Sequence, residues 1–372
     1  MRRPCLLATL TALVLCHAAA AHDRRPPRTD FDDQRMLLTG GQRVWPAAPP
    51  QRIPEPEPRP VPRAECDSDS RPLEGMQGRV TAEALGSPEA ERGWTCNAAP
   101  VGRHDTAGGF RTWRYVDRNG HVCAFYDTSI PAPLSAVTSG AGPSEGVAVL
   151  DMSDPARPVR TDTLRTLAML SPHESLNLNE RRGLLAAETG NGLTLPGSLA
   201  IYDVSEDCRQ PELQAEMPVL FGHESGWSPD GRTYWVGGGG GEVLAVDVAD
   251  PKTPRVVWRG VMFSHGLEVS EDGRTLFQTD PINGNVGILD VSEVQERRPS
   301  PVVREISRIT WDPVSVPQNA LPVRIKGRPY LLEFDEFAFR FNPPTLDDGV
   351  GAVRLIDISD LARPRVVSHL RL

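Results

Sequence analysis

The chain is predicted to be an all-β protein, on three observations. Five segments repeat a short alternating apolar strand that ends in Asp and is followed by a tight turn. Each of these segments is preceded by a second hairpin with Gly at its tip. No helical periodicity separates the repeats, and 36 prolines and 33 glycines suit a chain that is rich in turns.

Residues 1–21 are predicted to be a secretory signal peptide. They begin with two arginines, continue with an apolar stretch from Leu6 to Leu15, and end in small residues near Ala21. The apolar stretch is too short to cross a bilayer, and no later segment reaches about 18 uninterrupted apolar residues. We therefore expect a secreted protein, extracellular or periplasmic, without a transmembrane segment.

Residues 22–90 are predicted to form a linker that is largely disordered. Proline alternates with charge in "WPAAPPQRIPEPEPRPVPRAE", and such a segment buries too little apolar surface to offset its ordering entropy. Only "RMLLTGGQRVW" within it has the character of a strand. A spacer to the cell surface is the simplest role for it.

Residues 91–372 are predicted to form one repeat domain. The five Asp-ended segments are "VAVLDMSDPARPVRT", "LAIYDVSEDCRQPELQ", "VLAVDVADPKTPRVV", "VGILDVSEVQERRPSPVV" and "VRLIDISDLARPRVV". Their aspartates are Asp151, Asp203, Asp247, Asp290 and Asp357. An Asp before a tight turn accepts a bond from the backbone N–H two residues later, so we assign these side chains a structural role.

The preceding hairpins complete each repeat as a small sheet. Their tips lie at Gly120, Gly183, Gly231, Gly273 and Gly327, where a hairpin turn requires a positive φ. Two hairpins make a four-stranded antiparallel sheet, and such sheets bury both faces only by stacking radially. The sequence thus predicts a β-propeller with five visible blades. Three possibilities remain for ring closure: the ring closes with five blades, a sixth or seventh blade is missing, or residues 73–95 supply further strands. We favour a ring that is incomplete or that is completed by strands the sequence does not reveal.

The cysteines predict two disulfides. Removal of the signal peptide leaves four of them, Cys66, Cys96, Cys123 and Cys208, in an oxidising compartment. Four cysteines allow three pairings, between which the sequence does not choose.

The repeated strand-Asp-Val-Ser-Asp-Pro unit resembles the LVIVD-repeat family of secreted bacterial β-propellers. The resemblance covers the chain from about residue 96 to its end. It implies the propeller fold and export, and it implies no particular activity.

Propeller geometry brings polar side chains from several repeats to one face. The innermost strand of a blade crosses the ring and the next strand returns, so the start of the first and the end of the second share a face. The repeat position at the start of the first strand holds His173, His223, His265, Asn319 and Thr112, and Glu174 and Glu224 follow two of these histidines. The ends of the second strands supply Asp127, Glu188, Asp280, Asp335 and Glu336.

These residues suggest a metal or ligand site at that face. Imidazole and carboxylate groups bind divalent metal ions such as Zn²⁺, Mn²⁺, Fe²⁺ or Ca²⁺, so we take His173, His223 and His265 as candidate metal ligands. Glu174, Glu224, Asp280 and Asp335 are the candidate ligand-binding carboxylates. General acid–base chemistry is a further use of the same groups. The alternative is that each His stabilises a turn of its own blade.

Three functions remain open at this point. The first is a secreted propeller that binds an extracellular ligand or protein at one face, without catalysis. The second is an extracellular metal-dependent enzyme, a hydrolase or an oxidase, and the third is a surface scaffold tethered by the proline-rich segment. A formal net charge of −9 and the absence of a basic block argue against a nucleic-acid partner.

Overall fold

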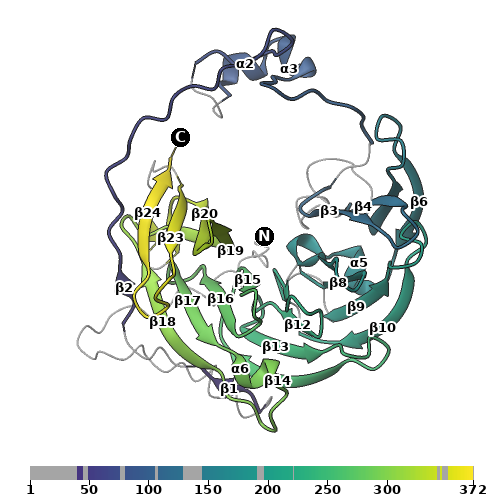
Figure 1. Ribbon diagram of the computed structural model, residues 1–372, viewed down its shortest axis with the longest axis vertical. Coiled ribbons are helices and arrows are strands. Elements are labelled where there is room, and N and C mark those ends of the chain that lie inside the picture. Colours follow the sequence, from purple (N-terminus) through teal and green to yellow (C-terminus); the bar gives the residue numbers. More distant parts are fainter. Residues whose placement is uncertain are drawn as a thin grey trace, which may run out of the picture.

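The structure is a computed structural model that describes residues 40–44, 49–75, 80–104, 108–128, 145–190, 197–220, 222–341, 344–345 and 351–371. Five antiparallel sheets lie around a common axis, each with its first strand innermost and its last strand outermost (Figure 1). This arrangement confirms the predicted β-propeller of four-stranded blades.

The first three sheets contain the following strands. Sheet 1 comprises β3 (Thr112–Val116), β4 (Val122–Asp127), β5 (Val147–Asp151) and β6 (Val159–Leu164). Sheet 2 comprises β7 (Asn177–Asn179), β8 (Leu184–Glu188), β9 (Ser198–Asp203) and β10 (Glu212–Pro218). Sheet 3 comprises β11 (Gly226–Trp227), β12 (Thr233–Val236), β13 (Glu242–Asp247) and β14 (Arg255–Val261).

Two further sheets complete the described arc. Sheet 4 comprises β15 (Leu267–Val269), β16 (Thr275–Asp280), β17 (Asn285–Asp290) and β18 (Arg304–Thr310). Sheet 5 comprises β19 (Val316–Ile325), β20 (Arg328–Phe337), β23 (Val353–Asp357) and β24 (Arg365–Leu370), and a small pair is formed by β21 (Arg340–Phe341) and β22 (Pro344–Thr345). The short helices are α5 (Leu167–Leu170), α6 (Ser292–Gln295) and the 3₁₀ turn η1 (His173–Ser175).

The side of the ring between sheets 5 and 1 is spanned by a segment with little β-structure. This segment carries α2 (Ala82–Leu85) and α3 (Glu89–Arg92) and runs around the opening (Figure 1). Within the described part of residues 73–95, the β-pairing is one isolated bridge between Arg71 and Thr95. The suggestion that residues 73–95 supply blade strands is therefore wrong for the residues described, because short helices with Gly at their ends occupy the place.

The described part of the predicted linker contacts the outer edge of the ring. β1 (Gln42–Arg43) pairs in parallel with β14, and β2 (Gln51–Arg52) pairs in parallel with β18. An outermost strand has unpaired backbone groups, and these short extended pieces satisfy some of them. Ile53 is buried in the apolar layer under sheet 4, which fixes the segment there. The boundaries 22–90 remain a prediction.

The turns follow the predicted chemistry. Each strand-ending aspartate accepts a bond from the backbone N–H two residues later, at 2.8–3.1 Å. The five hairpin glycines have φ between 64° and 85°. These are the left-handed conformations that favour Gly, so both repeated signals have a structural cause.

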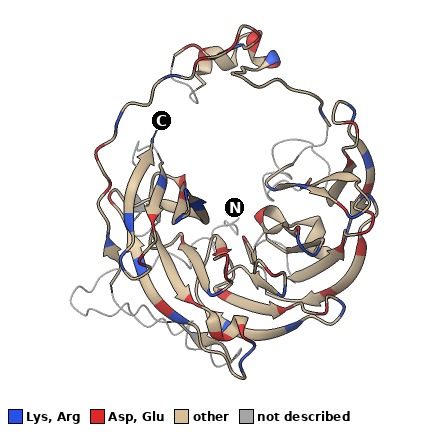
Figure 2. Ribbon diagram, in the orientation of Figure 1, with Lys and Arg blue, Asp and Glu red and all other residues tan. Residues whose placement is uncertain are grey.

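The spaces between sheets are filled by apolar side chains from neighbouring blades. Trp227, Trp235 and Trp258 belong to these layers and are at most 9% exposed. Figure 2 shows charged residues mainly at strand ends, in turns and on outer strands, while the middle strands are mostly uncharged. The core therefore lies between blades, and polar groups collect at the faces.

The four described cysteines form two disulfides. Cys66 bonds Cys96 across the segment with α2 and α3, and Cys123 of β4 bonds Cys208 after β9. The second bond joins sheets 1 and 2. Among the helices that the structure describes, none has the length and apolar character needed to cross a membrane.

Candidate functional site

Three histidines from three neighbouring sheets meet at one face of the ring. His173 lies in η1 just before β7, His223 precedes β11, and His265 precedes β15. The ring centroids of His173 and His223 are 5.0 Å apart, and those of His223 and His265 are 4.3 Å apart. The shared repeat position therefore brings residues some forty to fifty positions apart in sequence into direct contact.

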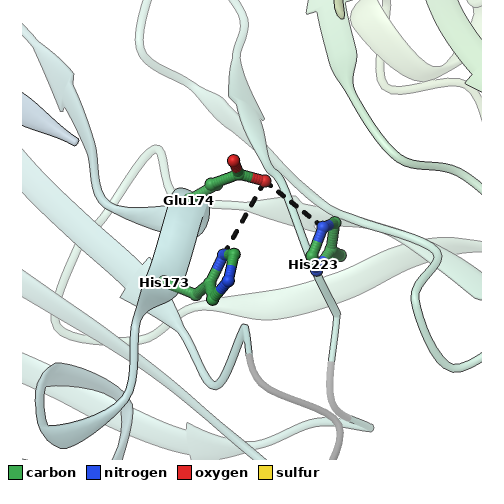
Figure 3. Close-up of side chains that lie close together, drawn as sticks. All are labelled: His173, Glu174 and His223. Atoms are coloured by element: carbon green, nitrogen blue, oxygen red, sulfur yellow. Dashed lines mark ion pairs between the residues drawn. The ribbon is translucent and has the colours of Figure 1, made fainter. Parts of the chain in front are cut away.

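Glu174 contacts all three rings of this histidine cluster, and Figure 3 shows its carboxylate between His173 and His223. Its Oε2 atom is 3.2 Å from His223 Nε2, 3.7 Å from His173 Nδ1 and 3.9 Å from His265 Nε2. The other carboxylate oxygen accepts a hydrogen bond from Gln318 Nε2 at 2.7 Å. One oxygen is thus fixed by the protein, and the other faces the imidazoles.

The second ring nitrogens of two histidines face protein acceptors. His223 Nδ1 is 3.2 Å from the Gly190 carbonyl oxygen, and His265 Nδ1 is 3.6 Å from Glu224 Oε2. The Nε2 atoms of the same two rings point at each other, 3.1 Å apart. This is the arrangement of metal-binding histidines, whose remaining N–H is oriented by a carbonyl or a carboxylate.

The distances match the spacing of ligands around one small cation. The Nε2 atoms of His223 and His265 and the Oε2 atom of Glu174 form a triangle with edges of 3.1, 3.2 and 3.9 Å. Ligand atoms about 2.0–2.2 Å from a tetrahedral zinc ion lie roughly 3.3–3.6 Å from one another. The described residues therefore offer a set of nitrogen and oxygen atoms that one divalent transition-metal ion can bridge.

Several buried polar atoms of the cluster lack a hydrogen-bond partner. These atoms are His173 Nδ1, Glu174 Oε2, Glu224 Oε2 and His265 Nδ1. Buried polar atoms are normally satisfied, so a group of such atoms at one place indicates an ordered water, an ion or a ligand between them. A cation bound between the rings accounts for Glu174 Oε2 and His173 Nδ1 together.

The backbone at His173 is strained. Its φ is +51°, in the left-handed region that a residue with a Cβ rarely adopts. The ring of Phe110 stacks on its imidazole with centroids 4.2 Å apart. Strained residues of this kind cluster at functional sites, because the surrounding structure has to hold them in place.

The protonation states favour a cation. Burial alone would raise the pKa of Glu174. Hydrogen bonding to His223 and the charges of the nearby imidazoles outweigh this effect and lower the pKa to about 2. Burial, followed by the charge on His223, lowers the pKa of His173. At neutral pH the cluster therefore holds an ionised carboxylate and a neutral imidazole, and these are the forms that bind metals.

A second layer of polar side chains supports the cluster from below. Arg111 forms an ion pair with Glu224, and Asn319 Nδ2 donates to Glu224 Oε1 at 2.7 Å and to Glu268 Oε1 at 3.0 Å. Burial raises the pKa of Glu268. Glu336 lies on the more exposed side, where its Oε2 atom is 2.9 Å from His265 Nε2 and its side chain is 31% exposed.

Other predicted site residues have different partners. Asp280 accepts bonds from the backbone of Ile282 and Asn283, so it caps its own turn. Asp335 accepts from Arg354 and from the backbone of Ala352. Their strand ends lie on the expected face, but both carboxylates are engaged outside the histidine cluster.

Two more predicted residues lie under the site rather than in it. Asp127 Oδ1 accepts from the backbone N–H of Arg111 at 3.2 Å. Glu188 is fully buried and accepts from the backbone N–H of Gly237 at 2.9 Å. Burial raises the pKa of Glu188 to about 8, so this side chain is uncharged at neutral pH.

Sequence reasoning did not single out Arg111, Gln318 or Phe110. Arg111 and Gln318 each precede the repeat position that Thr112 and Asn319 occupy, so the repeat alignment holds a signal for them. Phe110 lies one residue earlier and contacts a different blade.

A separate carboxylate–imidazole group joins Asp117, His121 and Asp207. Both oxygens of Asp117 already accept hydrogen bonds, from His121 and from backbone N–H groups including that of Cys208. Asp207 pairs with Arg209 at 2.8 Å. This group is therefore satisfied by the protein and stabilises the junction of sheets 1 and 2.

Comparison with known proteins shows similarity in fold alone. No protein-family model and no curated protein matches the chain. Similar solved structures include hydrazine synthase of Kuenenia stuttgartiensis, with 16% identity, TM-score 0.40 and coverage of 57% of this chain and 51% of that chain. The chain spans about half the length of that protein.

Two other solved structures cover more of the chain. A functionally unknown protein from Desulfotomaculum acetoxidans has 10% identity and TM-score 0.49, over 72% of this chain and 71% of that chain. The periplasmic gluconolactonase of Pseudomonas aeruginosa has 16% identity and TM-score 0.42, over 62% of this chain and 80% of that chain. These similarities concern the fold alone.

Proposed function

We propose that the protein is a secreted β-propeller of the LVIVD-repeat type that works as a metal-dependent hydrolase. His173, His223, His265 and Glu174 hold one divalent ion of the zinc type. The observation that carries this proposal is that one atom, Glu174 Oε2, lies 3.2–3.9 Å from a nitrogen of each of the three imidazoles.

The ligand set suits hydrolysis. Three histidines and one carboxylate fill a tetrahedral zinc ion, so a catalytic water would need a fifth position, and a zinc ion that bound a water there would lower its pKa to about 7. His223 is the most exposed of the three rings, at 28%, so this side of the site is open to a substrate. The Glu336 side chain is 31% exposed and its Oε2 atom lies 2.9 Å from His265 Nε2, beside the proposed ion, so we take it as the candidate proton acceptor.

Secretion is part of the proposal. The signal-like N-terminus, two disulfides and the absence of a membrane-spanning helix among the described residues fit an extracellular or periplasmic protein. Binding of an extracellular ligand without catalysis is the alternative use of the same site.

The test is a hydrolysis assay on the zinc-loaded full chain, with p-nitrophenyl acetate as the probe. We expect Glu336→Gln to lower kcat per bound zinc ion by about 10²-fold or more, the usual contribution of a general base, with the zinc content of both proteins measured alongside. Glu271→Gln, an exposed carboxylate on another loop, is the matched control and should retain the rate. Zinc-loaded protein without turnover would favour pure ligand binding, and a native iron or copper ion would favour an oxidase.

A further inference from the structure

One exposed aromatic side chain of the described residues contacts the histidine cluster, and the other two are close in sequence to its residues. Most Phe, Tyr and Trp side chains are buried or half-buried, and the exposed ones are Phe110, Phe263 and Phe337. Their exposed fractions are 43%, 45% and 43%. Large apolar groups left in water near a polar site are typical of ligand pockets, which combine apolar walls with a few polar groups.

Phe110 contacts a residue of the site, and Phe263 and Phe337 are close in sequence to two others. Phe110, just before β3, stacks on His173. Phe263 lies two residues before His265, and its carbonyl oxygen accepts from Gln278 Nε2 at 2.6 Å, which fixes its loop. Phe337 follows Glu336 directly in β20 and stacks on Phe339 with centroids 5.0 Å apart.

Propeller topology places the three rings at the same face. Phe110 and Phe263 precede innermost strands of sheets 1 and 4. Phe337 ends the second strand of sheet 5, and it is paired with Val316 at the start of β19. Starts of first strands and ends of second strands share a face, so these three residues, from three blades, lie at the face that holds the imidazoles.

We propose that the substrate carries an aryl or comparable flat apolar group next to the bond that is hydrolysed, and that these three phenylalanines contact it. The inference rests on the proposed metal-dependent function and adds the substrate class. Aromatic rings prefer offset-stacked or edge-to-face neighbours, so a flat group gains more from this surface than an aliphatic one of equal size.

Two hydroxamates test the proposal, because they bind zinc through the same group and differ only in the substituent. The zinc-loaded full chain is titrated with acetohydroxamate and with benzohydroxamate by calorimetry, and its zinc content is measured. We expect benzohydroxamate to bind at least tenfold more tightly, a ratio that corresponds to about 1.4 kcal/mol.

Variants test whether the exposed phenylalanines Phe110, Phe263 and Phe337, here called the rim, cause this ratio of affinities. Phe263 and Phe337 have no described ring contact with a proposed metal-ligating histidine, so their replacement by Ala should leave the metal site intact. Phe263→Ala and Phe337→Ala should each reduce the affinity ratio about threefold or more, because each removes part of the free energy gained by burying the phenyl group. Val159→Ala, at an exposed apolar position on β6, should keep it.

The outcomes separate the two proposals. Equal affinity for both hydroxamates in a protein that holds zinc would overturn the aryl substrate and leave the metal site standing. Failure to bind either hydroxamate, together with the absence of zinc, would overturn the metal-dependent function and the inference that rests on it. An unchanged ratio in both phenylalanine variants would also refute the contact with the rim.

Discussion

Replacement of Arg354 by Met should be among the most destabilising single changes in the ring. The Arg354 side chain is fully buried, lies 4.1 Å from the centre of the Trp311 ring, and pairs with Glu333 and Asp335 at 2.8 Å. Both carboxylates are also fully buried, and a third partner, Glu55 at 2.6 Å, comes from the N-terminal segment. Removal of one partner from a buried pair costs about 3–5 kcal/mol, because a charge is left uncompensated.

The reference for this change is the same substitution at an exposed pair. Arg324 and Glu271 lie 2.7 Å apart, but their side chains are 60% and 77% exposed. Arg324→Met should therefore cost less than about 1 kcal/mol. Urea unfolding at pH 7 measures both values from the midpoint, provided that the m-value is unchanged. A difference below about 1 kcal/mol between the two variants would refute the view that the buried charge network fixes sheet 5 and the N-terminal segment.

Two further predictions concern stability. Burial raises the pKa of Glu188 to about 8 from a usual 4.5, so this side chain should contribute a loss of about 4–5 kcal/mol of stability to the metal-free protein as pH rises from about 4.5 to 8, and Glu188→Gln should remove this contribution. Parallel pH–stability curves of the two proteins would contradict this. Replacement of Cys123 and Cys208 by Ser opens a link between residues 85 apart and should cost about 4.5 kcal/mol, against about 3.5 for Cys66 and Cys96, 30 apart. Thermal unfolding of the two variants measures both losses of stability. A larger loss on removal of the Cys66–Cys96 bond than of the Cys123–Cys208 bond would contradict this prediction.

Repetition explains how far the fold could be predicted from the sequence. The Asp-ended strands and the Gly hairpins recur in every blade, and each has a local cause, an N–H acceptor at the turn or a positive φ. The pairing of β1 with β14 and of β2 with β18 has no such signal, because two-residue strands show no alternation. Their position depends on the free edges of β14 and β18, which only the folded ring defines.

The same distinction applies to the site. Repeat position predicted that His173, His223 and His265 approach one another, since it fixes where the backbone lies. It does not fix which way a side chain turns, so Asp280 caps its own loop and Asp335 pairs with Arg354. For the same reason, the strand-end position of Glu336 does not show that its carboxylate contacts His265 directly.

The most direct test of the proposed metal centre is the metal content of the mature protein, measured by inductively coupled plasma mass spectrometry. We expect one divalent transition-metal ion per chain, and its loss when His223 and His265 are both replaced by Ala. His369→Ala, in β24 of sheet 5, is the matched control and should retain the ion. A purified protein without stoichiometric metal, and with no uptake of added Zn²⁺, would contradict the account.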